Sequence, residues 1–421
     1  ASGLPVVALA AACGPGGGGS PVADQEVTLE LLSRGDQAAR EVYEQQLREF
    51  AELRPKIHVN LSWAGTGGSS LILEKMTALV ASGTAPDLYW THVNIVPDLV
   101  EQQVSLALDP LARKDRSYQL GDLYKSAIDS LGYKDAIWGL PRETTSIIVY
   151  ANQELFGRNG VPVPRPDWRL DSLVDAARRV TRGEGTAKVY GTADWRPNMM
   201  VMIRTWQNGG DIVNKERTAS TIDSPAAIEA IQWVADLLNK HHVHPTPAEL
   251  KENALARFTS GRLAMMPTYS SYLIRVRKAN VPFEWDLLHL PQGKQRVTRT
   301  ASAGHSIFRG AKHPDQAWIA LAHGLTSERA FQLWAKSGLS IPSHKKVAAS
   351  SDHLDPTLPP KSAKVMLDAL EYARPEPITL RWDEVHDEMS KGLAPVWENK
   401  VSAESAARDV KQKLNAILAR S

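Results

Sequence analysis

The amino-acid sequence predicts an α/β protein that is divided into two lobes. Its 421 residues correspond to between two and three domains of roughly 150 residues each. Near the start of the chain, segments in which every second residue is apolar alternate with segments in which apolar residues recur with the period of a helix. This succession is typical of a mostly parallel sheet covered by helices, with ligand-binding loops at the carboxyl ends of its strands.

The first elements follow from this periodicity. Residues 27–31 alternate as a strand, and the loop 33–36 leads into a helix that Asp36 is suited to cap. Pro55 ends that helix, and residues 57–63 alternate as a second strand. The apolar face of the helix is formed by Ala39, Tyr43, Leu47 and Phe50.

A second helix and a third strand extend the series. Helical spacing over residues 72–80 ends at Gly83, and a short strand is expected at residues 87–90. Further along, residues 133–141 predict a hairpin that continues into a strand at 145–150. Ser224 and Pro225 open a later helix, and residues 406–418 form the last one.

The N-terminal segment has the composition of a secretion signal. An uncharged apolar run at residues 4–12 is too short to span a hydrocarbon core of about 30 Å, and Cys13 and the Gly-rich stretch 14–21 follow it. Residues 1–24 therefore resemble the remnant of a bacterial lipoprotein signal, in which Cys13 carries the lipid and the glycines form a tether. The alternative is a free thiol in an unstructured leader. Because Cys13 is the single cysteine, the fold has no internal disulfide.

Charge and aromatic content restrict the class of partner. The 49 Lys and Arg residues against 47 Asp and Glu give a net charge of +2, which supplies no basic field for nucleic acid. The chain contains 12 Trp but 6 Phe, although Phe packs a core equally well and has no N–H group to satisfy. We therefore expect some indole rings to face a small-molecule ligand.

Motifs of cofactor and metal enzymes are missing from the sequence. It contains no phosphate-binding Gly-Lys-Ser/Thr loop, no dinucleotide-binding G-x-G-x-x-G and no zinc-binding His-Glu-x-x-His. These absences argue against an enzyme, and we expect no cofactor, no metal and no catalytic residues. The cluster at residues 241–244 contains three histidines that could bind a metal adventitiously, but an exposed helix end needs no such role.

Five segments together resemble a known family. They cover residues 81–88, 138–143, 149–156 and 258–265, and the pair 304–305 followed by 312–318. Each is a weak motif, and 81–88 and 258–265 have a purely structural interpretation as a helix end that leads into a strand. In their order and spacing, the segments resemble the extracellular solute-binding proteins of bacterial carbohydrate ABC importers, the group that includes maltodextrin-binding proteins.

The resemblance implies a periplasmic-binding-protein fold with discontinuous lobes, each a mostly parallel sheet flanked by helices, joined by a hinge. Lobe 1 is expected at residues 25–145 with 301–346, and lobe 2 at 146–300 with 347–421. The chain is expected to cross between the lobes near residues 143–150, 295–302 and 343–352. The implied protein is an extracytoplasmic monomer, lipid-anchored or periplasmic, that captures a sugar between its lobes and delivers it to membrane permease subunits.

Sugar chemistry selects the candidate ligand-binding residues. Hydroxyl groups need paired donors and acceptors, and the C–H faces of a sugar ring need a flat aromatic partner. Candidates in the loops that follow the first strands and the Gly-Leu-Pro turn are Arg34, Asp36, Trp63, Thr66, Trp90, His92, Asn94, Arg142 and Glu143. Asp36 could serve only as a helix cap, and Arg142 with Glu143 could form a hinge ion pair.

The remaining candidates lie in later segments, where the resemblance implies cleft contacts for Tyr269 and Trp382 in particular. They are Asp194, Trp195, Asn208, Tyr269, Gly304, His305, Arg381 and Trp382. Trp206 has helical spacing behind Met202 and is expected in the core instead. The interpretation requires that Trp90, Trp195 and Trp382 share one groove.

Two other functions are consistent with these residues. Arg34, Arg142 and Arg381 could form an anion site for glycerol phosphate or a glycerophosphodiester, which importers of this family also take up. Glu143 and Asp194 could flank a glycosidic bond as the acid and base of a glycosidase. The excess of tryptophan favours a neutral sugar over the phosphorylated ligands, and we expect no hydrolysis of a glycoside.

Overall fold

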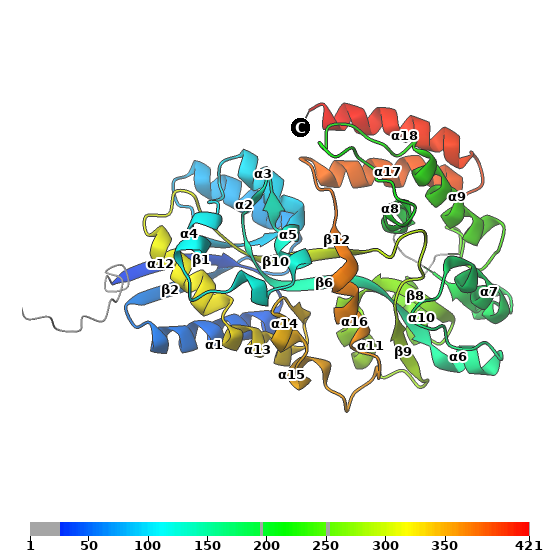
Figure 1. Cartoon of the computed structure of the whole chain (residues 1–421), viewed down its shortest axis with the longest axis horizontal. Helices are drawn as coiled ribbons and strands as arrows, with labels where there is room; N and C mark the ends of the chain where they lie inside the picture. Colours follow the sequence, from blue (N-terminus) through cyan, green and yellow to red (C-terminus); the bar gives the residue numbers. More distant parts are fainter. Residues whose placement is uncertain (1–25, 194–196, 250–252, 421) are drawn as a thin grey trace, which may run out of the picture.

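The computed structural model describes residues 26–193, 197–249 and 253–420. Figure 1 shows two lobes side by side, with the N-terminal strands in the first lobe and the C-terminal helices in the second. The two-lobed α/β fold that the sequence predicts is therefore confirmed. Within these described ranges, no helix is both long enough and apolar enough to cross a membrane.

The first lobe contains the predicted β-α-β-α-β series. Strand β1 (Val27–Ser33) lies between β2 (Ile57–Trp63) and β3 (Leu88–His92), and both run parallel to it. Helices α1 (Gln37–Leu53) and α2 (Ser69–Ala81) connect these strands. The carboxyl ends of β1 and β3 consequently lie at the same edge of the sheet, where Arg34 and His92 are found.

Two long strands, β6 (Leu140–Asn152) and β10 (Thr298–Ile307), run from one lobe into the other (Figure 1). β10 pairs antiparallel with β3 and with the part of β6 up to Ser146. From Ile147 onward, β6 pairs with strands of the second lobe instead. A single sheet of ten strands therefore continues through both lobes.

The main path of this sheet has the strand order β2-β1-β3-β10-β6-β8-β7. In this path, β7 spans Tyr190–Thr192 and β8 spans Leu263–Tyr269. Off the path, β9 (Trp285–Leu288) and β11 (Ile341–Pro342) pair with β6, and β12 (Ala373–Pro375) pairs with β10. In the second lobe, β6 runs antiparallel to β8 and β9, whereas we expected a mostly parallel sheet. Parallel pairing needs a local crossover connection, and β6 enters from the other lobe without one.

The helices cover the sheet lobe by lobe. Lobe 1 contains α3 (Val96–Glu101), α4 (Asp109–Lys114), α5 (Lys125–Ser130), α12 (Pro314–Ile319) and α13 (Glu328–Ser337). Lobe 2 contains α6 (Gln153–Arg158), α7 (Leu170–Val180), α8 (Pro197–Gln207), α9 (Pro225–Asn239), α10 (Ala254–Thr259), α11 (Leu273–Lys278), α17 (Trp382–Trp397) and α18 (Ala403–Leu418). Of these, α8, α9, α17 and α18 pack on one another at one side of the lobe (Figure 1).

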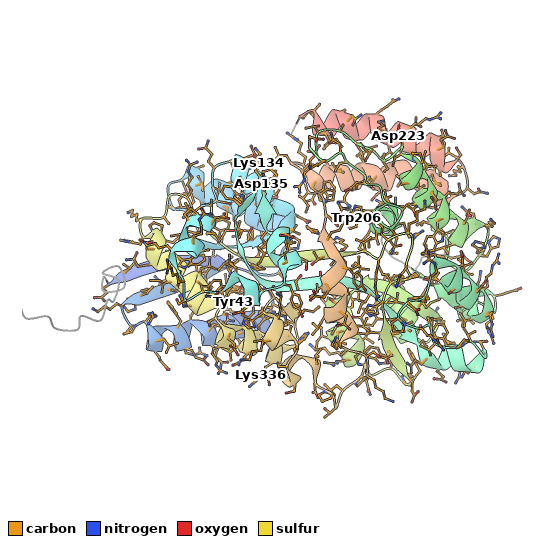
Figure 2. The ribbon with its side chains drawn as sticks, in the orientation of Figure 1. Tyr43, Lys134, Asp135, Trp206, Asp223 and Lys336 are labelled. Carbon is orange, nitrogen blue, oxygen red and sulfur yellow. The ribbon has the colours of Figure 1, made fainter. Side chains whose placement is uncertain are left out.

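Each lobe has an apolar core of its own. Tyr43 belongs to the core of lobe 1 and Trp206 to the core of lobe 2 (Figure 2). The prediction that Trp206 is a core residue is confirmed, since its side chain is 2 % exposed. A further cluster joins Tyr124 of the first lobe to Ile148 and Tyr150 of the second, so the lobes also share apolar packing beside the connecting strands.

The third crossing lies later than expected. Helices α14 (Lys345–Ala348) and α15 (Ser351–Leu354) both pack against α13 of the first lobe, and α16 (Val365–Asp368) packs against β6 and β9. The chain therefore changes lobes between Leu354 and Val365 rather than near residues 343–352. The change of partners within β6 lies beside the predicted boundary at residues 145 and 146, and the exact domain limits stay a prediction.

Candidate functional site

The candidate site is a cleft of about 430 Å³ at the junction of the two lobes. Strands β3 and β12 lie on the same side of β10, with His92 opposite Ala303 and Pro375 opposite Thr300. Their carboxyl ends therefore point toward each other across the middle of β10. The lining includes Arg34, Ser69, Trp90, His92, Asn94, Glu143, Thr145, Tyr269, Ser271, Arg299, Ser302 and Ser340.

The surface has larger hollows than this cleft, and the two with the greatest volumes among those described measure about 730 and 940 Å³. The first lies between the hairpin that contains Tyr133 and the loop at residues 215–218, and the second borders Asn208 and Arg374. Most of their charged side chains are exposed, among them Lys134 and Lys215. The smaller cleft instead gathers partly buried polar groups from both lobes, which is the usual composition of a ligand site.

Trp90 forms the first-lobe wall together with Arg34 and His92. The imidazole of His92 stacks on the indole of Trp90 with 5.8 Å between ring centroids and 14° between ring planes. The guanidinium carbon of Arg34 lies 4.7 Å from the centroid of the same indole. Trp90 is only 3 % exposed, so its ring supports these two polar groups rather than offering an open face to a sugar.

His92 is held as a neutral hydrogen-bonding group. Its Nδ1 accepts a hydrogen bond of 3.2 Å from the backbone N–H of Asn94. Burial, and secondarily the positive charge of Arg299, lower the pKa of His92 to about 4. The side-chain oxygen of Asn94 is buried without a hydrogen-bond partner among the described residues, which leaves it available to a ligand donor.

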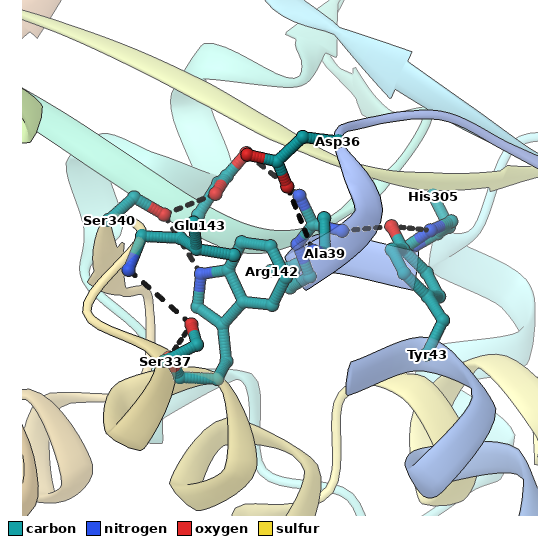
Figure 3. Close-up of polar contacts among 10 residues, drawn as sticks. Asp36, Ala39, Tyr43, Arg142, Glu143, His305, Ser337 and Ser340 are labelled. Atoms are coloured by element: carbon teal, nitrogen blue, oxygen red, sulfur yellow. Dashed lines mark hydrogen bonds and ion pairs between the residues drawn. The ribbon is translucent and has the colours of Figure 1, made fainter. Parts of the chain in front are cut away.

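Arg142 and Glu143 form an ion pair of 2.8 Å at the floor of the cleft (Figure 3). Arg142 is 3 % exposed and lies 3.7 Å from the ring centroid of Trp334, and it also donates to the hydroxyl of Tyr43. Burial opposes the charge of Arg142, but Glu143 and Tyr43 outweigh it and raise its pKa. Glu143 is 20 % exposed and also accepts from Ser340, so its carboxylate reaches the cleft.

A second buried ion pair joins Arg299 of β10 to Glu376, which follows β12. The indole N–H of Trp382 donates to the Glu376 carboxylate at 2.7 Å, and His386 lies 3.3 Å from it. Burial opposes the charge of Glu376, but Arg299 and these neighbours outweigh it and lower the pKa of the carboxyl below its usual range. Here the arginine lines the cleft and the glutamate lies beneath it.

Tyr269 is the half-buried aromatic ring of the second-lobe wall. It follows the buried residues of β8, and its ring stacks on Tyr272 with 6.5 Å between centroids. The guanidinium carbon of Arg299 lies 5.2 Å from the centroid of Tyr269. The structure thus brings together six of the predicted residues, namely Arg34, Trp90, His92, Asn94, Glu143 and Tyr269, and places Arg142 directly beneath Glu143.

Gly304 and His305 were expected at the cleft, and the structure places both in the interior instead. A Cβ atom on Gly304 would lie 1.9 Å from the carbonyl oxygen of Leu140, so glycine is needed for the close approach of β6 and β10 at a β-bulge. His305 is fully buried, with its Nε2 at 2.8 Å from the hydroxyl of Tyr43 (Figure 3). Its burial lowers its pKa well below the usual value.

The expectation that Trp382 lines the same groove as Trp90 is wrong. Trp382 is 1 % exposed and packs in the core of lobe 2, whereas Trp90 packs in a separate apolar cluster of lobe 1. The position at the start of α17 turns the indole inward, where the buried Glu376 accepts its N–H. Trp63 likewise packs on Tyr43 with 5.6 Å between centroids and does not line the cleft.

Four other candidates lie outside the cleft. Asp36 caps α1 by accepting from the backbone N–H of Ala39 at 2.9 Å, so its capping role is confirmed, and Thr66 is exposed. Asn208 donates to the carbonyl of Ala226 at 3.1 Å. Arg381 pairs with Glu384 at 2.7 Å on the surface. Asp194 and Trp195, as well as Cys13, lie outside the described residues.

Polar residues of the connecting strands and nearby loops also belong to the site, although we did not predict them. They are Ser69, Thr145, Ser271, Arg299, Ser302, Ser340 and Glu376. A signal for one of them exists. In the strand at residues 298–307, Arg299 is a single charge among small and apolar residues, and a charge in a buried strand needs a partner or a ligand.

The described residues offer no arrangement for the other chemistries. Within the described ranges, no group of three or more His, Cys, Asp or Glu side chains could hold a metal ion. Arg142 is engaged by Glu143, and Arg381 lies outside the cleft, so the predicted three-arginine anion site is not assembled. Glu143 is the one carboxylate among the described residues that line the cleft, so these residues supply no pair of carboxylates for a glycosidase.

Comparison with known proteins is consistent with this architecture. A curated relative from Brucella abortus (strain 2308), described as a putative binding protein, is 22 % identical over 386 residues, which is 89 % of each chain. The solved structure of the sugar-binding protein MalE from Xanthomonas citri superposes with a TM-score of 0.82 at 16 % identity, over 94 % of this chain and 98 % of that one.

Another similar structure is the cyclic alpha-maltosyl-1,6-maltose binding protein from Arthrobacter globiformis. It has a TM-score of 0.80 at 17 % identity and covers 94 % of this chain and 100 % of its own. The sequence profile described as bacterial extracellular solute-binding protein matches residues 32–328, more than half of the chain. The chain therefore belongs to the family of bacterial extracellular solute-binding proteins.

Proposed function

We propose that the protein is the substrate-binding subunit of a bacterial ABC importer and captures a sugar or oligosaccharide in the cleft between its lobes. The observation that carries the proposal is the convergence of β3 and β12 on β10, which brings polar side chains of both lobes to one place. The solved structures of similar fold include proteins named for binding a maltosyl-maltose ring and other sugars. A ligand that touches both walls at once favours the closed arrangement of the lobes.

Within this proposal, the cleft residues have distinct roles. Glu143 and Asn94 offer acceptor oxygens to sugar hydroxyls, and Arg34 and Arg299 offer donors. Tyr269 supplies the aromatic surface for the C–H face of a ring, a role that Trp90 and Trp382 are too buried to fill. Asp194 and Trp195 remain predicted contacts.

A thermal-shift screen over mono-, di- and oligosaccharides tests this function. A sugar at 100 times its Kd stabilises the folded protein by about 2.7 kcal/mol, which raises the Tm measurably. Tyr269→Ala should lose the shift, whereas Asn208→Ala, outside the cleft, should keep it. If no sugar raises the Tm of the parent protein, the proposed function is wrong.

The cellular setting belongs to the same proposal. The family acts outside the cytoplasm, and we infer that Cys13 carries a lipid that tethers a monomer to the membrane surface next to its permease. Cys13→Ala should then move the protein from the membrane fraction to the medium or periplasm. Equal membrane association of the variant would contradict the anchor.

A further inference from the structure

The charges of the cleft do not balance. Arg142 pairs with Glu143, and Arg299 pairs with Glu376, so these four groups cancel in two pairs. His92 is neutral at pH 7, because burial lowers its pKa. Among the described residues that line or underlie the cleft, Arg34 is the remaining cation.

Arg34 is placed as a ligand group rather than as a surface charge. It follows β1 at the cleft and is half-buried, with its guanidinium held against the indole of Trp90. No hydrogen bond or ion pair joins its side chain to another residue of the described ranges, and its Nε is buried without a partner. Its pKa is lowered, mainly by burial, while the neighbouring charges of Glu143 and Arg142 act in opposite directions.

A second donor of the cleft is also unpaired. Arg299 is 5 % exposed and uses its Nε for Glu376, but its Nη1 is buried without a hydrogen-bond partner. A desolvated guanidinium with free N–H groups is poorly satisfied by hydroxyl groups alone, because a planar anionic acceptor fits its fork with two charge-assisted hydrogen bonds.

On the basis of the proposed function, we infer that the preferred sugar carries one carboxylate, as a uronic acid does, and that Arg34 binds this carboxylate with help from the free Nη1 of Arg299. Arg34 is then the residue that sets the specificity for an acidic over a neutral sugar. The remaining groups, Glu143, Asn94 and Tyr269, are left for the hydroxyls and the ring face.

The charge count favours a carboxylate over a phosphate. A carboxylate brings one negative charge, which matches the single surplus cation Arg34. A phosphomonoester carries about −1.5 to −2 at neutral pH, and the cleft has no second uncommitted cation among the described residues. The neutral pairs Arg142–Glu143 and Arg299–Glu376 would have to break to supply one.

The test compares matched ligands by calorimetry on the full chain. The panel pairs glucose with glucuronic acid and galactose with galacturonic acid, includes disaccharides built from them, and adds a sugar phosphate and a glycerophosphodiester. We expect a uronic acid sugar to bind about 10- to 100-fold more tightly than its neutral partner, as a charge-assisted pair predicts. This preference should shrink with added salt.

Variants separate a ligand contact from an effect on folding. Arg34→Gln should lower the affinity for the acidic sugar about 10- to 100-fold more than the affinity for its neutral partner, so that the preference is lost. Arg34→Lys should keep part of the preference for the acidic sugar, because the positive charge stays. The rest should be lost, because lysine lacks the two parallel N–H donors of the guanidinium. Arg381→Gln removes the same charge from the surface outside the cleft and should change neither affinity.

Each other outcome overturns the inference. Equal affinity for both members of every pair would reject the carboxylate and leave the proposed sugar-binding function intact. Tighter binding of the sugar phosphate or the phosphodiester than of the uronic acid sugars would show that the ligand is a phosphate rather than a carboxylate. Loss of the preference in Arg381→Gln would assign it to the overall charge, and binding of no ligand at all would reject the proposed function as well.

Discussion

The two arginine–glutamate pairs of the cleft differ in which partner is buried and which one reaches the cleft. On the first-lobe side, Arg142 is buried and Glu143 reaches the cleft, whereas on the second-lobe side Glu376 is buried and Arg299 lines the cleft. Both arginines lie on a connecting strand, β6 or β10. The same chemical pair therefore presents an acceptor from one wall and a donor from the other, which suits a ligand that contacts both lobes.

The difference in burial also determines how much stability is lost when one partner of each pair is removed. The buried member of the first pair lies against the aromatic rings of Tyr43 and Trp334, while Glu143 keeps some contact with water. In the second pair, both side chains are almost fully buried, at 6 % and 4 % exposed. Removing one partner should therefore cost more in the second pair than in the first.

The largest effect is expected for Glu376→Gln. This change leaves Arg299 as an uncompensated buried charge and weakens the contacts to Trp382 and His386, so the free energy of unfolding should fall by about 3 to 5 kcal/mol. Urea unfolding of the variant and the parent measures the loss. The double variant Arg299→Met with Glu376→Leu should recover most of it, and a single-variant loss below about 1 kcal/mol would contradict the burial of this pair.

A smaller effect is expected for Arg142→Met. The methionine keeps apolar packing against Trp334, and Glu143 can be hydrated from the cleft, so the loss in unfolding free energy should be about 2 kcal/mol. The same urea experiment measures it. A loss equal to that of Glu376→Gln would show that the two pairs are energetically alike, against the comparison drawn above.

The third prediction concerns the pH dependence of stability through His92, which lies between the two pairs. Its pKa is about 4 in the folded protein and about 6.5 in the unfolded chain, so below pH 6.5 the unfolded chain takes up more protons. Stability should therefore fall as the pH decreases from 6.5 to 4. For a partly exposed group, we expect this loss to be about 1 to 2 kcal/mol.

His92→Gln should flatten the unfolding free energy over this pH range when urea curves are recorded at each pH. The buried His305 also has a lowered pKa, so some dependence of the unfolding free energy on pH should remain in His92→Gln. The double variant Tyr43→Phe with His305→Gln measures the part of the pH dependence that is due to His305. An unchanged slope in His92→Gln would mean that His92 is already hydrated in the folded protein.

Local sequence patterns were sufficient to predict the first helices and strands of lobe 1 and some residues of the first-lobe wall of the cleft. The strand and helix periodicities located β1, α1, β2, α2 and β3, and polar residues directly after strand ends, such as Arg34 and His92, lie at the cleft as expected. The strands and helices follow from the spacing of neighbouring residues. Since parallel strands direct their carboxyl ends to one edge of the sheet, the residues that follow these strands are expected at one place without knowledge of other contacts.

The second wall depends on contacts that no local pattern reveals. Arg299 and Glu376 are 77 residues apart and meet only because β12 pairs with β10. The burial of Trp382 depends on packing of α17 against α8, so composition alone suggested a binding residue where the fold needs a core residue. Gly304 and His305 were misassigned for the same reason, since the approach of β6 to β10 is a tertiary contact.

The change of partners within β6 restricts how the lobes can move. Because β6 and β10 remain hydrogen-bonded to each other up to Ser146 and Thr300, sliding one lobe along the other would break this ladder, while additional twist of the two strands would preserve it. We therefore expect the lobes to move by rotation about an axis close to these strands, so that the distance between the two walls changes while the connecting ladder stays intact.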